Sequence, residues 1–267
     1  MITCVTPSAL HLACETDHVL EASLFCDGAY DINLSSDLQN CSVRLIHNNR
    51  THDDWILLYL LVGKFAQRQC SLQLMLPYIS YGRQTPDYLQ TLLKPLNHSA
   101  IQQILTFDLH QDQMGIINLS TATLLASDIR RRGLQQALLI APDEGSIRRM
   151  ERLATLTGQQ VVGLKKVRSR EGITITSSTP LSGRGEAIIV DDMVDTGSTL
   201  KACIEYLFQY GLKTVHVYAT HGVLSYGVGD WATGLASLTF LNTLPADERN
   251  DTVRWLDIRG ELIDYAG

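Results

Sequence analysis

The chain has 267 residues, of which 45% are hydrophobic and 19% are charged, a composition that is typical of a globular protein and excludes a disordered or fibrous one. Its net charge of -6 argues against a surface dedicated to nucleic acid, because such surfaces neutralise backbone phosphates with basic residues. The longest apolar run, residues 55–63, is too short to span a bilayer, and residues 1–7 lack the features of a signal peptide. We therefore expect a cytoplasmic protein with neither a nucleic-acid partner nor a membrane partner.

Short apolar runs rich in β-branched residues alternate with helical patterns, and each run leads into a polar or glycine-containing turn. Such runs are typical of buried parallel strands. The expected strands are residues 43–47, 72–77, 103–107, 137–141, 161–164, 187–190 and 214–219. The expected helices are residues 53–69, 87–96, 120–132, 145–156 and 198–210, with Gly133, Gly158 and Gly211 placed as C-terminal caps.

This alternation predicts an α/β protein with parallel sheets flanked by helices. Each half of the chain has its own strand–helix alternation, so we expect two domains, residues 1–122 and 123–267. The cysteines are scattered, with no CxxC pair and no histidine placed to complete a zinc site. We expect them to be reduced and mostly buried.

An acidic, glycine-containing segment separates the strand at 187–190 from the helix that begins at Ser198. Backbone N–H groups of residues 195–199 can converge on a phosphate, whose charge the helix dipole favours. Asp191 and Asp192 suit the neutral hydroxyls of a ribose, although capping of the following helix is a competing interpretation for aspartates here. The segment predicts a ribose-phosphate site made of Asp191, Asp192, Asp195, Thr196, Gly197, Ser198 and Thr199.

Residues 190–199, Val-Asp-Asp-Met-Val-Asp-Thr-Gly-Ser-Thr, resemble the motif that binds phosphoribosyl diphosphate (PRPP) in proteins of the phosphoribosyltransferase-like fold. Further segments resemble the family that makes PRPP, ribose-phosphate pyrophosphokinase. In chain order they are residues 25–28, 76–84, 106–110, 141–145, 219–225 and 242–245 with 256–258. The resemblance implies two phosphoribosyltransferase-like domains, assembly into dimers or hexamers, and transfer of the diphosphoryl group of ATP to the 1-hydroxyl of ribose 5-phosphate, giving PRPP and AMP.

The resemblance also implies roles for residues outside this segment. Lys166 and Arg168 match the K-x-R pair of a flexible catalytic loop, with Lys165 as the alternative if the alignment slips by one residue. Considered singly, these residues also have ordinary structural interpretations. Lys166 and Arg168 fit a basic surface loop, and Arg83 fits a solvated surface charge. Phe25 fits a core residue, and Asp27 fits a hairpin turn. The implied ATP-binding residues are Phe25, Asp27, Arg83, Gln84 and His110, and the implied Mg²⁺ ligands are His110 and Asp143.

The sequence departs from the family pattern in its nucleotide half. Ala29 replaces a glutamate, Thr85 replaces an acidic residue, and the stretch after Gln84 is short and lacks a basic segment. These departures put regulation by phosphate and ADP in doubt and leave the nucleotide preference open.

Two alternative functions remain: a catalytically weak regulatory paralogue, and a phosphoribosyltransferase that consumes PRPP. Retention of Asp143, Lys166 and Arg168 argues against the first alternative. The segments that contain Arg83 and His110 argue against the second, because transferases have no matching N-terminal half.

Overall fold

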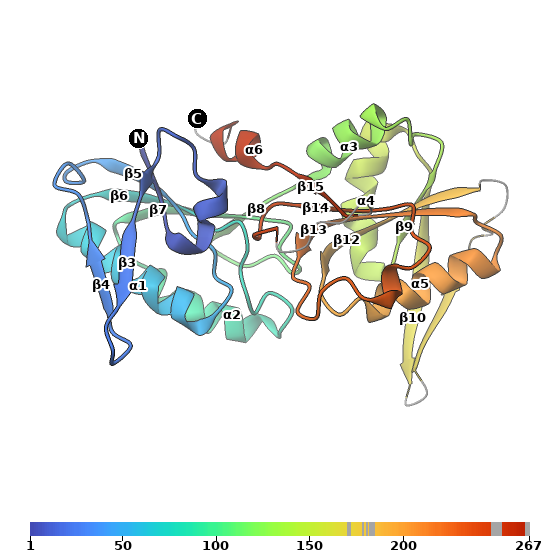
Figure 1. The fold of residues 1–267 in the computed structure, drawn as a ribbon, viewed down its shortest axis with the longest axis horizontal. Coiled ribbons are helices and arrows are strands. Elements are labelled where there is room, and N and C mark those ends of the chain that lie inside the picture. The colour runs from blue at the N-terminus through green and yellow to red at the C-terminus, as the bar shows by residue number, and fades with distance from the viewer. Residues whose placement is uncertain (170–171, 178, 180, 182–184, 247–252, 265–267) are drawn as a thin grey trace. The chain divides into compact units, whose positions relative to one another are not determined.

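The computed structural model describes all residues except 170–171, 178, 180, 182–184, 247–252 and 265–267 (Figure 1). The chain forms two compact units, which we call the N-terminal unit and the C-terminal unit. The first consists of Met1–Leu119, Thr243–Pro245 and Ile258–Gly267, and the second of Ser120–Asn242 and Ala246–Asp257. The chain thus leaves the N-terminal unit after Leu119, and the domain boundary at 122/123 stays a prediction.

Two short C-terminal segments belong to the N-terminal unit and are hydrogen-bonded to residues 44 and 48 of the first segment. The Arg44 guanidinium donates to the carbonyl oxygen of Leu262 over 2.7 Å. The Asn48 side-chain amide donates to the carbonyl oxygen of Thr243 over 2.9 Å. The compact units are therefore not continuous in sequence.

The N-terminal unit contains a sheet in which every pair of neighbouring strands is parallel. Its order is β2 (His18–Val19), β1 (Ile2–Val5), β5 (Ser42–Ile46), β6 (Ser71–Met75), β7 (Ile101–Phe107) and β8 (Ile116–Leu119). An antiparallel hairpin, β3 (Glu21–Leu24) and β4 (Tyr30–Asn33), extends from this unit (Figure 1). The helical elements are η1 (Pro7–Leu12), α1 (His52–Gln67), α2 (Pro86–Leu93), η2 (Lys94–Leu96) and α6 (Arg259–Asp264).

Helix α1 shows how the sequence specifies this unit. Its N-terminus is a capping box, in which the Thr51 side chain accepts from the Asp54 backbone and the Asp54 carboxylate accepts from the Thr51 backbone. The apolar residues of α1 recur at three- and four-residue spacing, so they form one stripe. Buried members of this stripe, Trp55, Leu58, Leu61, Val62 and Phe65, join the core against the sheet.

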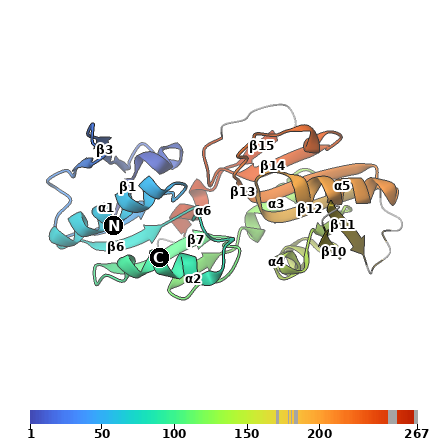
Figure 2. The same ribbon diagram turned by 90° about the horizontal axis from the view of Figure 1, so that it is seen from below.

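The C-terminal unit contains a mixed sheet. Its order is β11 (Gly172–Ser177), β10 (Val161–Ser169), β9 (Leu138–Ala141), β12 (Glu186–Val194), β13 (Thr214–Gly222), β14 (Ser237–Leu241) and β15 (Val253–Leu256). Only β11 runs antiparallel to its neighbour within this described sheet. Helices α3 (Ala122–Arg131) and α4 (Glu144–Thr157) lie on one face and α5 (Ser198–Gln209) on the other, with η3 (Asp230–Ala232) following β13 (Figures 1 and 2).

The predicted α/β class with parallel sheets flanked by helices is confirmed. The glycine caps are confirmed as well, since Gly133, Gly158 and Gly211 all have positive φ angles. The expectation for the cysteines was only half right, because Cys4, Cys70 and Cys203 are buried and the other three are partly or fully exposed. None of the helices in the described part of the chain is long and apolar enough to cross a membrane.

Candidate functional site

The carboxyl ends of three neighbouring strands in the C-terminal unit carry the polar residues of the candidate site. The strands β10, β9 and β12 are adjacent in the sheet. In parallel α/β sheets ligands bind beyond the carboxyl ends of the strands. Lys166 lies on β10, Asp143 follows β9, and Asp191 lies on β12, so topology brings residues from distant parts of the sequence to one edge.

Asp191 and Asp192 lie within a strand, which corrects the expectation that a loop begins after Val190. β12 continues to Val194 because its backbone remains paired with β13, with Asp191 opposite Ala219 and Val194 opposite Gly222. Asp192 is buried, with 3% of its surface exposed, whereas Asp191 is only partly buried.

The turn between β12 and α5 depends on Gly197. This residue is the N-cap of α5 and has a φ of 73°, a left-handed conformation that glycine adopts at little cost. A Cβ atom at this position would overlap the indole ring of Trp231 in η3. The close contact with Trp231 fixes the backbone at the point where the helix begins.

The hydroxyl and carboxylate groups of this turn have defined partners. Thr196 donates a hydrogen bond from its hydroxyl to that of Ser198 over 3.3 Å, and both side chains are exposed. The Asp195 carboxylate accepts from the backbone N–H of Ser225 over 3.2 Å. Asp195 therefore anchors the segment after β13 to the turn.

Lys166 reaches the first turn of α5, where its ammonium group donates to the Thr199 hydroxyl over 2.6 Å. The expectation that the strand ends at residue 164 was wrong, because β10 continues to Ser169 and pairs antiparallel with β11. This pairing places Lys166 opposite Ile175 and Arg168 opposite Ile173. Lys165 is exposed and lies on the other face of the strand. The side chain of Arg168 and all of Arg170 lie outside the described part of the chain.

Arg149 on α4 is a member of this site that sequence reasoning missed. Its guanidinium lies 4.0 Å from a carboxylate oxygen of Asp191 and 3.8 Å from one of Asp192. The spacing of residues along α4 could have indicated Arg149. Ser146, Met150 and Leu153 are buried on the sheet-facing side of this helix, and Arg149 lies between them at helical spacing. The sequence alone did not connect this side with the acidic strand.

The carboxylates of this site are crowded. Burial first, and then the charge of Asp192, raise the pKa of Asp191 well above its usual range; Asp143 adds to this effect and Arg149 opposes it. Burial raises the pKa of the Cys203 thiol on α5 to about 12, with further effects of Asp191 and Lys166. Arg149 is therefore the positive group that opposes the negative charges of Asp192 and Asp143 at Asp191.

Asp143 is the N-cap of α4. One oxygen of its carboxylate accepts from both the backbone N–H and the hydroxyl of Ser146, over 2.9 and 2.8 Å. Among the described residues no group of three or more histidine, cysteine, aspartate or glutamate side chains could hold a metal ion by itself. Asp143 belongs to the C-terminal unit and His110 to the N-terminal unit.

The residues predicted to bind ATP are all exposed on the N-terminal unit. Phe25 begins the turn of the β3–β4 hairpin and is 59% exposed, so its interpretation as a core residue was wrong. In the same turn Asp27 accepts from the backbone N–H of Ala29 over 3.0 Å. Arg83 and Gln84 follow Tyr81, whose φ is 67°, and His110 lies beyond the carboxyl end of β7.

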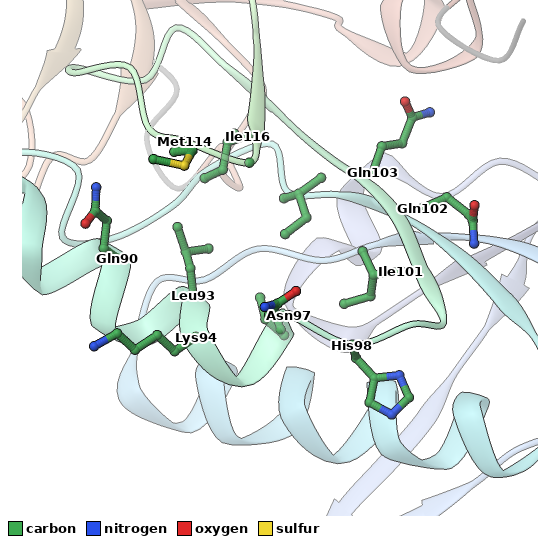
Figure 3. A pocket seen from close by; sticks show the side chains of 13 residues that line it. Gln90, Leu93, Lys94, Asn97, His98, Ile101, Gln102, Gln103, Met114 and Ile116 are labelled. Atoms are coloured by element: carbon green, nitrogen blue, oxygen red, sulfur yellow. The ribbon is translucent and has the colours of Figure 1, made fainter.

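A groove of about 620 Å³ lies elsewhere on the N-terminal unit, between α2, η2 and the first residues of β7 and β8 (Figure 3). Leu93, Ile101, Ile116 and Met114 border it, whereas His98 and Gln102 point away (Figure 3). None of the predicted site residues lines this groove. It is thus separate from the strand ends that carry His110.

Known proteins resemble this chain in sequence and in fold. Residues 116–231, from β8 to η3, match the model of the phosphoribosyl transferase domain. The ribose-phosphate pyrophosphokinase of Vibrio parahaemolyticus is 28% identical over 78% of this chain and 72% of its own length. That of Buchnera aphidicola is 25% identical over 90% of this chain and 84% of its own.

The chain is similar to ribose-phosphate pyrophosphokinases over most of its length. The match to the Buchnera protein includes most of the N-terminal unit, which a phosphoribosyl transferase domain alone does not account for. The fold agrees along the whole chain with the crystal structure of phosphoribosylpyrophosphate synthetase from Mycobacterium smegmatis, with a TM-score of 0.86 over 99% of this chain and 97% of that one at 22% identity.

Proposed function

We propose that this protein is a ribose-phosphate diphosphokinase, which transfers the diphosphoryl group of ATP to the 1-hydroxyl of ribose 5-phosphate and releases PRPP and AMP. The observation that carries the proposal is the meeting of three features at one sheet edge of the C-terminal unit. They are the paired carboxylates of Asp191 and Asp192, the glycine turn at the start of α5, and the Lys166 ammonium group on Thr199.

The turn and the aspartates suit opposite ends of ribose 5-phosphate. The phosphate would bind residues 196–199, where backbone N–H groups of the first turn of α5 and hydroxyls of Thr196, Ser198 and Thr199 can donate to it. The sugar hydroxyls would donate to the carboxylates of Asp191 and Asp192. Arg149, at 3.8 to 4.0 Å from both carboxylates, would hold them in place and favour their charged form.

Lys166 and Arg168 are proposed as the catalytic residues. In the reaction the 1-hydroxyl oxygen of the sugar forms a bond to the β-phosphorus of ATP, the bond from that phosphorus to the α,β-bridging oxygen breaks, and the hydroxyl proton is lost. Phosphoryl transfer is accelerated mainly by positioning and by positive charge on the group in transit. Lys166 supplies such a charge next to the proposed phosphate turn.

The family implies Mg²⁺, and the acidic residues of the C-terminal unit fit it. Mg²⁺ is usually held by one or two carboxylates together with water and substrate phosphates, so no complete cage of protein ligands is needed. Burial first, and then the negative charge of Asp192 and Asp143, raise the pKa of Asp191, so a cation beside it would favour its charged form. Asp143 would hold Mg²⁺ in the C-terminal unit, where the ion would neutralise charge on the phosphates. His110 is the ligand proposed for the N-terminal unit.

ATP is proposed to bind through the exposed residues of the N-terminal unit. Arg83 presents a guanidinium suited to bidentate contact with phosphate, and Gln84 and His110 supply further polar groups. Phe25 offers an exposed aromatic ring for stacking on adenine, with Asp27 beside it in the hairpin turn. Such an exposed ring suits the nucleotide site of a neighbouring subunit in a homo-oligomer, a dimer or a hexamer.

The proposal is tested by incubating the protein with ATP, Mg²⁺ and ribose 5-phosphate and measuring AMP and PRPP by chromatography. We expect AMP and PRPP to appear in equal amounts and only when the sugar is present. Binding of ribose 5-phosphate without formation of AMP would instead favour the regulatory paralogue, consistent with the absence of a glutamate at Ala29. Consumption of PRPP in the presence of a nucleobase would favour the phosphoribosyltransferase.

A further inference from the structure

Two cysteine sulfur atoms of the N-terminal unit lie next to each other, away from the strand ends that carry the proposed ATP residues. Cys41 directly precedes β5 and Cys70 directly precedes β6. The two strands pair in parallel, with Ser42 opposite Ser71, so the two cysteines occupy the preceding pair of opposed positions. Their Sγ atoms are 3.6 Å apart.

The backbone on both sides fixes this arrangement. The N–H of Ser71 donates to the carbonyl oxygen of Cys41 over 3.0 Å, and the N–H of Asn40 donates to the carbonyl oxygen of Arg68 over 2.9 Å. The hydroxyl groups of Ser42 and Ser71 are hydrogen-bonded as well, over 3.0 Å. The sulfur atoms therefore face each other because the strand register holds them there.

The two thiols differ in their access to solvent. Cys41 is partly exposed, while Cys70 is 3% exposed and lies 3.6 Å from the carbonyl oxygen of Leu38. Burial, followed by the contact with Cys70, raises the pKa of Cys41. A reagent in solution can thus react directly with the sulfur of Cys41, whereas the sulfur of Cys70 is reached through Cys41.

We propose that Cys41 and Cys70 are a reversible dithiol–disulfide site that low-molecular-weight disulfides oxidise. The Cys41 thiolate attacks one sulfur of the small disulfide, whose S–S bond breaks and releases one small thiol. Cys70 then loses its proton and attacks the Cys41 sulfur, which forms the Cys41–Cys70 bond and releases the second small thiol. Two protein thiols are oxidised and one small disulfide is reduced, so atoms and electrons balance.

The bond would require a short movement of the side chains. A disulfide has an S–S distance of about 2.05 Å, and rotation of the two cysteine side chains can bring the sulfur atoms together without breaking the strand register. The bond would close a loop that contains α1 and would tie the amino ends of β5 and β6. It would therefore raise the melting temperature of the protein without adding any contact at the Lys166 site.

The full chain is incubated with glutathione disulfide at pH 8, alkylated and cut before aspartate residues. This cleavage leaves Cys41 as the only cysteine of peptide 37–52 and Cys70 as the only cysteine of peptide 54–86. We expect the two peptides to be recovered as one cross-linked species that dithiothreitol separates. The rate should rise from pH 7 to pH 9, because the attacking thiolate becomes more abundant.

Recovery of the two peptides as alkylated thiols, while the exposed Cys26 carries glutathione, would overturn the proposal. Separate glutathione adducts on both peptides would overturn it as well, since the second attack would then not occur. Cys41→Ser should abolish both the cross-link and the rise in melting temperature, and the matched control Cys26→Ser should change neither. In Cys70→Ser, Cys41 should retain one bound glutathione, which the wild-type protein releases when Cys70 attacks the Cys41 sulfur.

Discussion

Gly197→Ala is the substitution that tests how the turn of the proposed ribose-phosphate site is built. At this residue the backbone has a φ of 73° and a Cβ atom would overlap Cγ, Cδ2 and Cε2 of Trp231. Trp231 belongs to the core of the C-terminal unit and is 9% exposed. The ring therefore has little room to move away, and the turn or the ring must shift.

The expected decrease in the free energy of unfolding of Gly197→Ala has two parts. A left-handed conformation costs a residue with a side chain about 1–2 kcal/mol. Forcing an extra carbon into a packed core costs about 1–3 kcal/mol more. The free energy of unfolding should thus fall by about 2–5 kcal/mol, and the affinity for ribose 5-phosphate should fall because the displaced backbone no longer points at the phosphate.

Gly158→Ala provides a matched control. Gly158 ends α4 with a φ of 74°, but no atom lies within 4 Å of its Cβ position. This variant should lose only the conformational part, about 1–2 kcal/mol, and should bind the sugar normally. Urea unfolding and calorimetric titration with ribose 5-phosphate measure both quantities. Equal stability losses in the two variants would show that Trp231 does not constrain the turn.

Three further changes test the site and the core. Lys166→Met should reduce turnover by about 10²–10³-fold, as loss of one preorganised donor does, and Lys165→Met should leave it nearly unchanged in the AMP assay. Arg149→Met should raise the Kd for ribose 5-phosphate about tenfold, because Asp191 loses its opposing charge; an unchanged titration would remove Arg149 from the site. Burial lowers the pKa of His47 to about 4, so the stabilisation by its neutral form, about 3 kcal/mol, is complete above pH 6.5 and is lost as the pH falls toward 4. Urea unfolding from pH 7 to pH 4 should show this loss, and His47→Gln should flatten it.

The sequence predicted the layers of the fold because buried strands and amphipathic helices carry a local signal. The run at 137–141 contains only apolar residues, and α1 has a capping box before its apolar stripe. Strand ends carry a weaker signal. Asp191 and Asp192 are polar yet remain in β12, because the pairing with β13 extends past the apolar residues.

Contacts between distant segments explain what the sequence could not reveal. The basic segment at 165–168 contains no turn residue and pairs with β11, but its charges favoured a loop. Arg149 faces the acidic strand only because α4 packs beside β12. Gly197 must lack a side chain because Trp231, a neighbour far along the chain, occupies the position of its Cβ atom, and the local sequence does not indicate this contact.

The charge distribution of the C-terminal unit favours one orientation of the sugar. The carboxylates of Asp191 and Asp192 would repel a phosphate, and burial together with the charges of Asp192 and Asp143 raises the pKa of Asp191 despite the opposing charge of Arg149. The start of α5 offers N–H groups and the Lys166 ammonium group, which attract an anion. Ribose 5-phosphate placed with its phosphate at α5 and its hydroxyls at the aspartates satisfies both ends, whereas the reverse placement satisfies neither. In the proposed site, the carboxylates of β12 and the start of α5 would thus hold the two ends of the sugar in one orientation.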